Sequence, residues 1–188
     1  MLAYVFWHWP RETVPRDRYR DLLRDFHLSL GRRRPSGFLE SSAFEIPGAS
    51  WIPRSASAFE DWYLLEGSAA LDLLDRGAVE APHQAAHDTV AAAAAGGAGG
   101  LYRLRAGRPL GGEARFAMWF GKPDGVSYRE LYALLEPRIS AGEPLWGRQM
   151  VLGPAPEFCL HARTETPLPA PIAAATIPLN PLFPGASR

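Results

Sequence analysis

The chain has 188 residues, 47% of them hydrophobic and 21% charged, which is typical of a globular protein with its own core. Its 20 basic and 20 acidic residues cancel, so no net charge draws it toward nucleic acid or an anionic membrane. The single Cys159 excludes an internal disulfide, and no apolar run approaches the roughly 20 residues of a membrane span. We therefore expect a cytoplasmic protein without nucleic-acid or membrane partners.

The first half predicts the order strand, helix, strand, strand, helix, strand. Apolar residues alternate with period two at 3–9 and recur with helical spacing from Asp17 to Leu30. Ser68 is expected to start the second helix, and the glycine-rich run 96–100 is interpreted as a hinge or linker. The remaining strands are expected at 37–46, 59–65 and 101–105.

The second half repeats this scheme but lacks the second helix. A strand is expected at 115–120, a helix at 127–139, and a hairpin at 146–152 and 158–164. Six prolines then interrupt the tail from Pro167 onward, so the tail is expected to run extended. Its apolar side chains predict that part of it lies against the protein.

Two pairs of segments indicate an internal duplication. Tyr4-Val5-Phe6-Trp7-His8 corresponds to Phe116-Ala117-Met118-Trp119-Phe120, and Tyr19-Arg20-Asp21-Leu22-Leu23 corresponds to Tyr128-Arg129-Glu130-Leu131-Tyr132. A βαββαβ order with aromatic strands resembles the ferredoxin-like unit of the dimeric α/β-barrel superfamily. Over residues 3–165 the resemblance implies an α+β fold in which two ferredoxin-like halves form one pseudo-twofold barrel.

The expected divisions are a first half at 1–108, a truncated second half at 109–166 and an extended proline-rich tail at 167–188. The superfamily includes stress-responsive barrel proteins, small cofactor-independent monooxygenases and haem-handling enzymes. The order of elements alone carries over none of their catalytic residues. Whether this duplicated chain is a monomer or pairs again as a homodimer stays open.

The more polar faces of the strands supply the candidate site. On the last predicted strand Cys159, His161 and Arg163 alternate with apolar residues, and they are expected to face the barrel interior or its mouth. The corresponding faces of the predicted strands at 3–9 and 59–65 add further candidate residues. The predicted ligand-binding residues are Tyr4, His8, Glu60, Trp62, His161 and Arg163. Such a mixture predicts one shared pocket for a small apolar or aromatic molecule.

Metal and nucleophile signals are weak. His83 and His87 have HxxxH spacing, but Gln84 stands where a zinc peptidase needs glutamate, and no third ligand is evident. A solvated helix surface is the simpler interpretation, so no metal and no cofactor are predicted, with haem on a single histidine as the alternative. Cys159 and His161 share a strand face, but no oxyanion hole or orienting carboxylate accompanies them.

Three classes of function follow. The leading hypothesis is a small-ligand-binding barrel with an aromatic-lined pocket. The enzymatic alternatives are cofactor-independent oxidation of an aromatic substrate, with His8 or His161 as the base, and haem handling. The third class is a structural or interaction module whose aromatic interior is a filled core.

Overall fold

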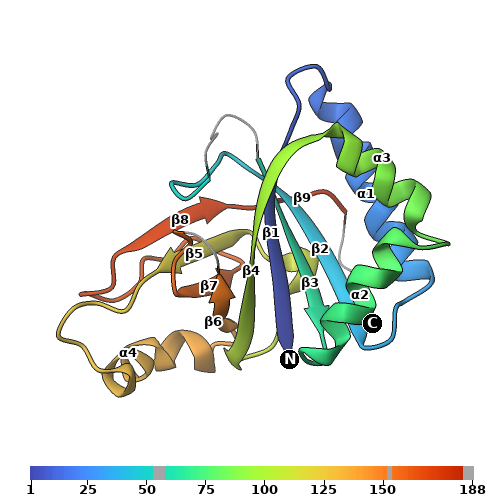
Figure 1. Ribbon diagram of the computed structural model, residues 1–188. Helices are drawn as coiled ribbons and strands as arrows, with labels where there is room; N and C mark the ends of the chain where they lie inside the picture. The colour runs from blue at the N-terminus through green and yellow to red at the C-terminus, as the bar shows by residue number, and fades with distance from the viewer. Residues whose placement is uncertain (53–57, 152–153, 184–188) are drawn as a thin grey trace.

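The described residues form one nine-stranded antiparallel sheet that curls into a nearly closed barrel, with helices outside it (Figure 1). The computed structural model describes residues 1–52, 58–151 and 154–183. The strands are β1 (Leu2–Pro10), β2 (Phe38–Ile46), β3 (Ala58–Leu65), β4 (Ala94–Ala106), β5 (Phe116–Phe120), β6 (Leu145–Val151), β7 (Phe158–Ala162), β8 (Ala174–Pro178) and β9 (Asn180–Pro181). The helices are α1 (Arg16–Arg32), α2 (Ala69–Val79), α3 (Gln84–Ala93) and α4 (Tyr128–Ser140), with one 3-10 turn at Gly111–Glu113. The α+β class predicted from the sequence is confirmed.

The strand order in the sheet is β8-β5-β7-β6-β4-β1-β3-β2-β9. The first four strands in sequence therefore lie as β4-β1-β3-β2, and the next four as β8-β5-β7-β6. These two groups join where β4 pairs with β6. The two groups follow the same pattern. The strand that comes first in sequence, β1 or β5, lies in the second position of its group, beside the strand that comes third, β3 or β7.

The proline-rich tail supplies the other join. Residues of β8 pair with β5, and after Leu179 the short β9 pairs with β2 at the opposite end of the strand order. The backbone N–H of Leu179 donates to the carbonyl of Arg115, and Leu182 N–H donates to Ala43. The tail thus forms both outermost strands of the sheet and connects its two ends.

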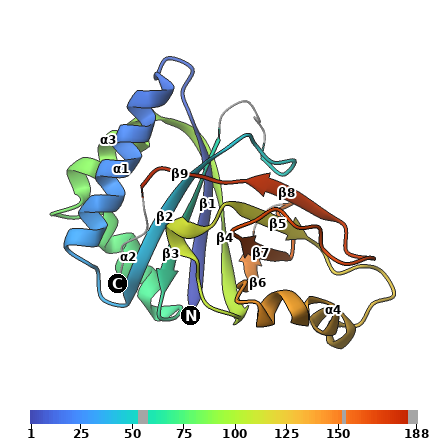
Figure 2. The same ribbon diagram turned by 180° about the vertical axis from the view of Figure 1, so that it is seen from behind.

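The helices cover the outside of the sheet in two places. Helices α1, α2 and α3 lie together against the β4-β1-β3-β2 part, whereas α4 covers the β5, β6 and β7 part (Figure 2). The predicted stripe on α1 is buried, from Tyr19 to Leu30. Helix α4 begins at a capping box in which Ser127 and Glu130 satisfy each other's backbone N–H. No helix in the described part of the chain is long and apolar enough to cross a membrane.

The glycine-rich run 96–100 lies within β4, so the hinge or linker interpretation is wrong. Its glycines make room for aromatic rings of the neighbouring β1. A Cβ on Gly97 would collide with the ring of Phe6, and one on Gly99 would lie 2.8 Å from Cε2 of Tyr4. The missing side chains are what let these two rings lie across β4.

The barrel interior is filled by large aromatic side chains. Trp7, Trp62, Trp119 and Trp146 are buried there, and the rings of Trp7 and Trp119 lie 5.3 Å apart between centroids. The cavity beside Trp62 and His161 measures only about 10 Å³. That space holds at most one water molecule, so the interior is a packed core.

Candidate functional site

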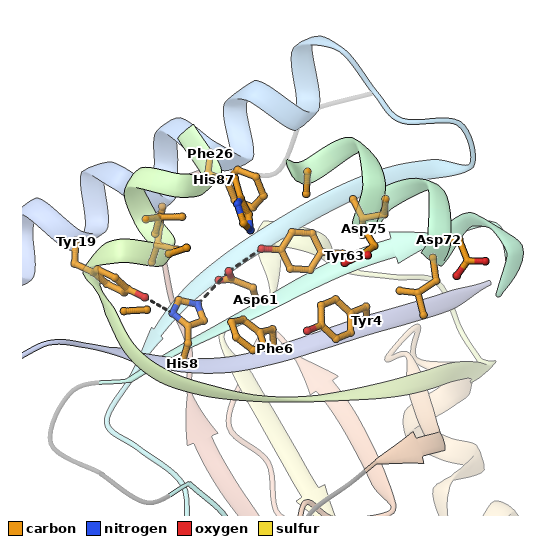
Figure 3. A pocket seen from close by; sticks show the side chains of 17 residues that line it. Tyr4, Phe6, His8, Tyr19, Phe26, Asp61, Tyr63, Asp72, Asp75 and His87 are labelled. Atoms are coloured by element: carbon orange, nitrogen blue, oxygen red, sulfur yellow. Dashed lines mark hydrogen bonds and ion pairs between the residues drawn. The ribbon is translucent and has the colours of Figure 1, made fainter. Parts of the chain in front are cut away.

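A cavity of about 540 Å³ lies between the outer face of β1 and β3 and the three helices α1, α2 and α3 (Figure 3). Its walls are mostly aromatic and aliphatic, with a few polar groups, as in sites for small organic molecules. The polar and aromatic lining residues are Tyr4, Phe6, His8, Tyr19, Phe26, Asp61, Tyr63, Asp72, Asp75 and His87. His8, Tyr19 and Asp61 are almost completely buried and form its inner end, whereas Asp72 and Asp75 on α2 are exposed and mark its mouth.

Asp61 is the centre of a buried polar network at the inner end. Its Oδ2 lies 3.1 Å from Nε2 of His8 and 3.1 Å from Nε2 of His27, and it accepts a 3.0 Å hydrogen bond from the Tyr63 hydroxyl. Nδ1 of His8 lies 2.8 Å from the Tyr19 hydroxyl. The His8 N–H does not point straight at Oδ2, so this is a close polar contact and not a well-aligned hydrogen bond.

The charge state of this network follows from its contacts. Burial alone would raise the pKa of Asp61, but the neighbouring imidazoles of His8 and His27 hold it well below its ordinary value. An ionised carboxylate only accepts, so both imidazoles present an N–H to it. With Nε2–H facing the carboxylate, Nδ1 is the nitrogen of His8 that can accept a hydrogen bond from the Tyr19 hydroxyl. Burial raises the pKa of Tyr19, so its phenol stays protonated.

Tyr19, His8 and Asp61 thus form a hydroxyl–imidazole–carboxylate series. The carboxylate stabilises an imidazolium, and the imidazole is within reach of the hydroxyl proton. This arrangement suits transfer of a proton from a molecule in the cavity to His8 through Tyr19.

The structure divides the six predicted ligand-binding residues among three environments. Tyr4 and His8 line the cavity. Three others, Glu60, Trp62 and His161, lie in the barrel interior. Arg163 lies at the surface in an ion pair with Glu113.

The prediction that His8, Trp62 and His161 share one cavity is therefore wrong. On β1 the side chains of Tyr4 and His8 point toward the helices and Trp7 points into the barrel, the reverse of the predicted assignment. Both faces of β1 are buried, so polarity could not distinguish them.

Four site residues were not predicted from the sequence, namely Asp61, Tyr63, Tyr19 and His27. Asp61 and Tyr63 alternate with Glu60 and Trp62 on β3, so they point outward to the helices. A signal was available, because Asp61 is a lone carboxylate on a strand face of aromatic and aliphatic residues that must pack beneath helices.

Glu60 occupies an unusual place inside the barrel. Its two carboxyl oxygens accept hydrogen bonds of 2.8 Å from Trp7 Nε1 and 2.7 Å from Trp62 Nε1. Burial raises the pKa of Glu60 to about 7, although both indoles favour the ionised form. The ring of His161 packs 4.3 Å from Trp62, and burial lowers its pKa to about 3. The space beside Trp62 and His161 is too small for a ligand.

The two histidines of the HxxxH spacing, His83 and His87, lie in different environments. His83 is buried, with Nδ1 2.7 Å from the Ser29 hydroxyl and Nε2 2.9 Å from the Arg33 carbonyl, so the solvated-surface interpretation is wrong for it. His87 lines the cavity beside Phe26. Within the described ranges, no group of three or more His, Cys, Asp or Glu side chains is arranged to hold a metal ion.

Comparison with solved structures shows the fold. An anthrone oxidase-like protein superposes with a TM-score of 0.53 at 8% identity, over 95% of this chain and 90% of its own. A protein from Lactobacillus acidophilus NCFM with a provisional assignment as a monooxygenase gives a TM-score of 0.59 at 9% identity, over 97% of this chain and 94% of its own. No protein-family model and no curated protein matches the sequence significantly.

Proposed function

We propose that the cavity binds an aromatic substrate and that the protein oxidises it with molecular oxygen as a cofactor-independent monooxygenase. The observation that carries this proposal is the Tyr19–His8–Asp61 series at the inner end of an aromatic cavity. The monooxygenase-like and anthrone oxidase-like proteins that share the fold support the same class of reaction.

The reaction begins with loss of a proton. A tricyclic ketone such as anthrone carries a CH₂ group whose proton passes to the Tyr19 oxygen while the Tyr19 proton passes to Nδ1 of His8. Asp61 stabilises the imidazolium that forms, and because Tyr19 has a raised pKa its phenolate does not accumulate.

Oxygen is the second substrate and the oxidant. The substrate carbanion gives one electron to O₂, and the two radicals combine to form a C–O bond and a peroxide. The peroxide takes up the proton from His8, its O–O bond breaks as the second C–H proton leaves, and water departs. The product carries a new carbonyl group, and His8 returns to its neutral form.

We also propose that the chain is a tandem duplication of a ferredoxin-like unit. The orders β4-β1-β3-β2 and β8-β5-β7-β6 follow one pattern. The registers agree, since Val5 pairs with Trp62 as Ala117 pairs with His161. This correspondence makes Trp62 and His161 equivalent, and their rings are in contact inside the barrel.

Under this correspondence only the first half carries the catalytic set. The position of Asp61 is taken by Leu160, and that of His8 by Phe120. The second half also covers its sheet with α4 alone and has no counterpart of α2 and α3 in the described chain. We therefore expect one active site per chain, at the first half.

The test measures oxygen uptake and anthraquinone formation from anthrone, corrected for spontaneous oxidation. We expect His8→Ala to lower kcat/KM by about 100-fold or more, the usual contribution of a positioned base, and Tyr19→Phe to lower it similarly. His161→Ala changes a buried histidine outside the cavity and serves as the control. Oxidation at the uncatalysed rate, or full activity in His8→Ala, would overturn the proposal. Anthrone binding without oxygen uptake would instead favour a ligand-binding protein.

A further inference from the structure

Apart from histidines, the charged side chains among the described residues that line the cavity are all aspartates. The three are Asp61, Asp72 and Asp75, and the lining includes neither Lys nor Arg. The two histidines, His8 and His87, are the remaining titratable nitrogen groups there. The cavity thus presents a negative electrostatic potential to whatever enters it.

Asp72 and Asp75 concentrate this potential at the mouth. They lie three residues apart on α2, so they share one face of the helix, and both are exposed (Figure 3). No ion pair to either carboxylate is found within the described part of the chain. Burial is the main cause that raises the pKa of Tyr4, and the negative charges of Asp61 and Asp75 raise it further.

A second, independent feature is an unpaired hydrogen-bond acceptor at the inner end of the cavity. Oδ1 of Asp61 is buried and has no hydrogen-bond partner among the described atoms, although Asp61 lines the cavity. A buried acceptor left unpaired is costly, and native structures rarely keep one without a ligand or a water molecule. A ligand that fills the cavity can supply this donor.

The walls between these two ends suit a flat ring. Tyr4 stacks against Phe6 at 6.0 Å and against Tyr63 at 5.8 Å between ring centroids, and all three side chains face the cavity. Aromatic faces attract a ring, and they also attract a cation within about 6 Å. The wall therefore favours an aromatic ligand with a positive charge at one end.

We propose that the cavity selects aromatic amines. The ammonium group lies at the mouth between Asp72 and Asp75, the ring lies along Tyr4 and Tyr63, and a ring hydroxyl or N–H donates to Asp61 Oδ1. This inference rests on the proposed function and adds a charge preference to it. Neutral aromatics such as anthrone still fit, cationic aromatics bind more tightly, and a carboxylate on the ligand is repelled at the mouth.

Calorimetric titration at low salt with three probes of one skeleton tests the selection. The probes are 2-(1-naphthyl)ethylamine, 2-(1-naphthyl)ethanol and 1-naphthylacetate, which are cationic, neutral and anionic at pH 7. We expect the amine to bind at least about tenfold more tightly than the acetate, because two exposed carboxylates attract one and repel the other. The preference should shrink toward unity in the double variant Asp72→Asn/Asp75→Asn and with added salt.

Asp124→Asn is the matched control, an exposed aspartate in the loop before α4, and it should keep the full preference. Equal affinity for amine and acetate in the unsubstituted protein would overturn the selection while leaving the aromatic site intact. A preference that survives the double variant would overturn the role of Asp72 and Asp75. Failure of all three probes to bind would overturn this inference and the proposed function together.

Discussion

Glu60→Gln is predicted to change the dependence of stability on pH, because Glu60 is a buried carboxyl inside the barrel. In the unfolded chain this carboxyl ionises near its ordinary pKa of 4.5, whereas in the folded protein it keeps its proton up to about pH 7. Between these values the unfolded state binds fewer protons, so the contribution of Glu60 to stability falls as pH rises. At about 1.4 kcal/mol per pKa unit the total loss is about 3 kcal/mol.

His161 works in the opposite direction. Its pKa falls from 6.5 in the unfolded chain to about 3 in the barrel, so the unfolded state binds more protons between these values and stability rises with pH. The two slopes oppose each other between pH 4.5 and 6.5. We therefore expect these two groups to leave the unsubstituted protein nearly insensitive to pH in that window, and Glu60→Gln to expose the slope of His161.

Urea unfolding at pH 4.5, 5.5, 6.5 and 7.5 checks this expectation. The free energy of unfolding of the original protein minus that of Glu60→Gln should fall by about 3 kcal/mol across the series. Glu80→Gln removes an exposed carboxyl and is the control. A difference that stays constant with pH would show that Glu60 is ionised in the folded barrel and would refute the reasoning.

Three further predictions concern the cavity and the barrel. Gly97→Ala should push the ring of Phe6 into the cavity and weaken naphthylethanol binding by about tenfold in calorimetry, whereas Gly67→Ala, which meets no atom within 4 Å, should leave it unchanged. Deleting residues 167–188 removes β8 and β9, so the melting temperature should fall by about 10 °C or more, and an unchanged value would contradict the role of the tail. Arg163→Ala breaks an exposed ion pair, so chemical denaturation should show a loss below about 1 kcal/mol with probe binding intact.

The fold was largely predictable because its periodic patterns are strong. The alternation at 3–9 and the stripe from Tyr19 to Leu30 each point to one element type, and both elements form as expected. The run 96–100 could not be assigned to a strand from the sequence, since glycine normally interrupts strands. Its place beneath aromatic rings depends on β1, a partner strand distant in sequence.

The site was only partly predictable for a physical reason. Polarity separates the faces of a strand when one of them meets water, but β1 and β3 have a barrel core on one side and helices on the other. Tyr4 and His8 therefore line a cavity on the helix side of the sheet and not inside the barrel, and their role in ligand binding stays a prediction. In the sequence Asp61 stands out only as a lone carboxylate on its strand face, and the network around it forms when α1 brings His27 to Asp61 and Tyr19 to His8.

The bridge formed by β8 and β9 also bears on the order of folding during synthesis. On the outer edge of β2, Phe44 pairs with Pro181 of β9. This edge therefore stays unpaired until almost the whole described chain has left the ribosome. An open strand edge is a template for pairing with other chains. Nascent and truncated molecules should therefore be the forms most prone to aggregate, and closure of the barrel by its last strands is what ends that exposure.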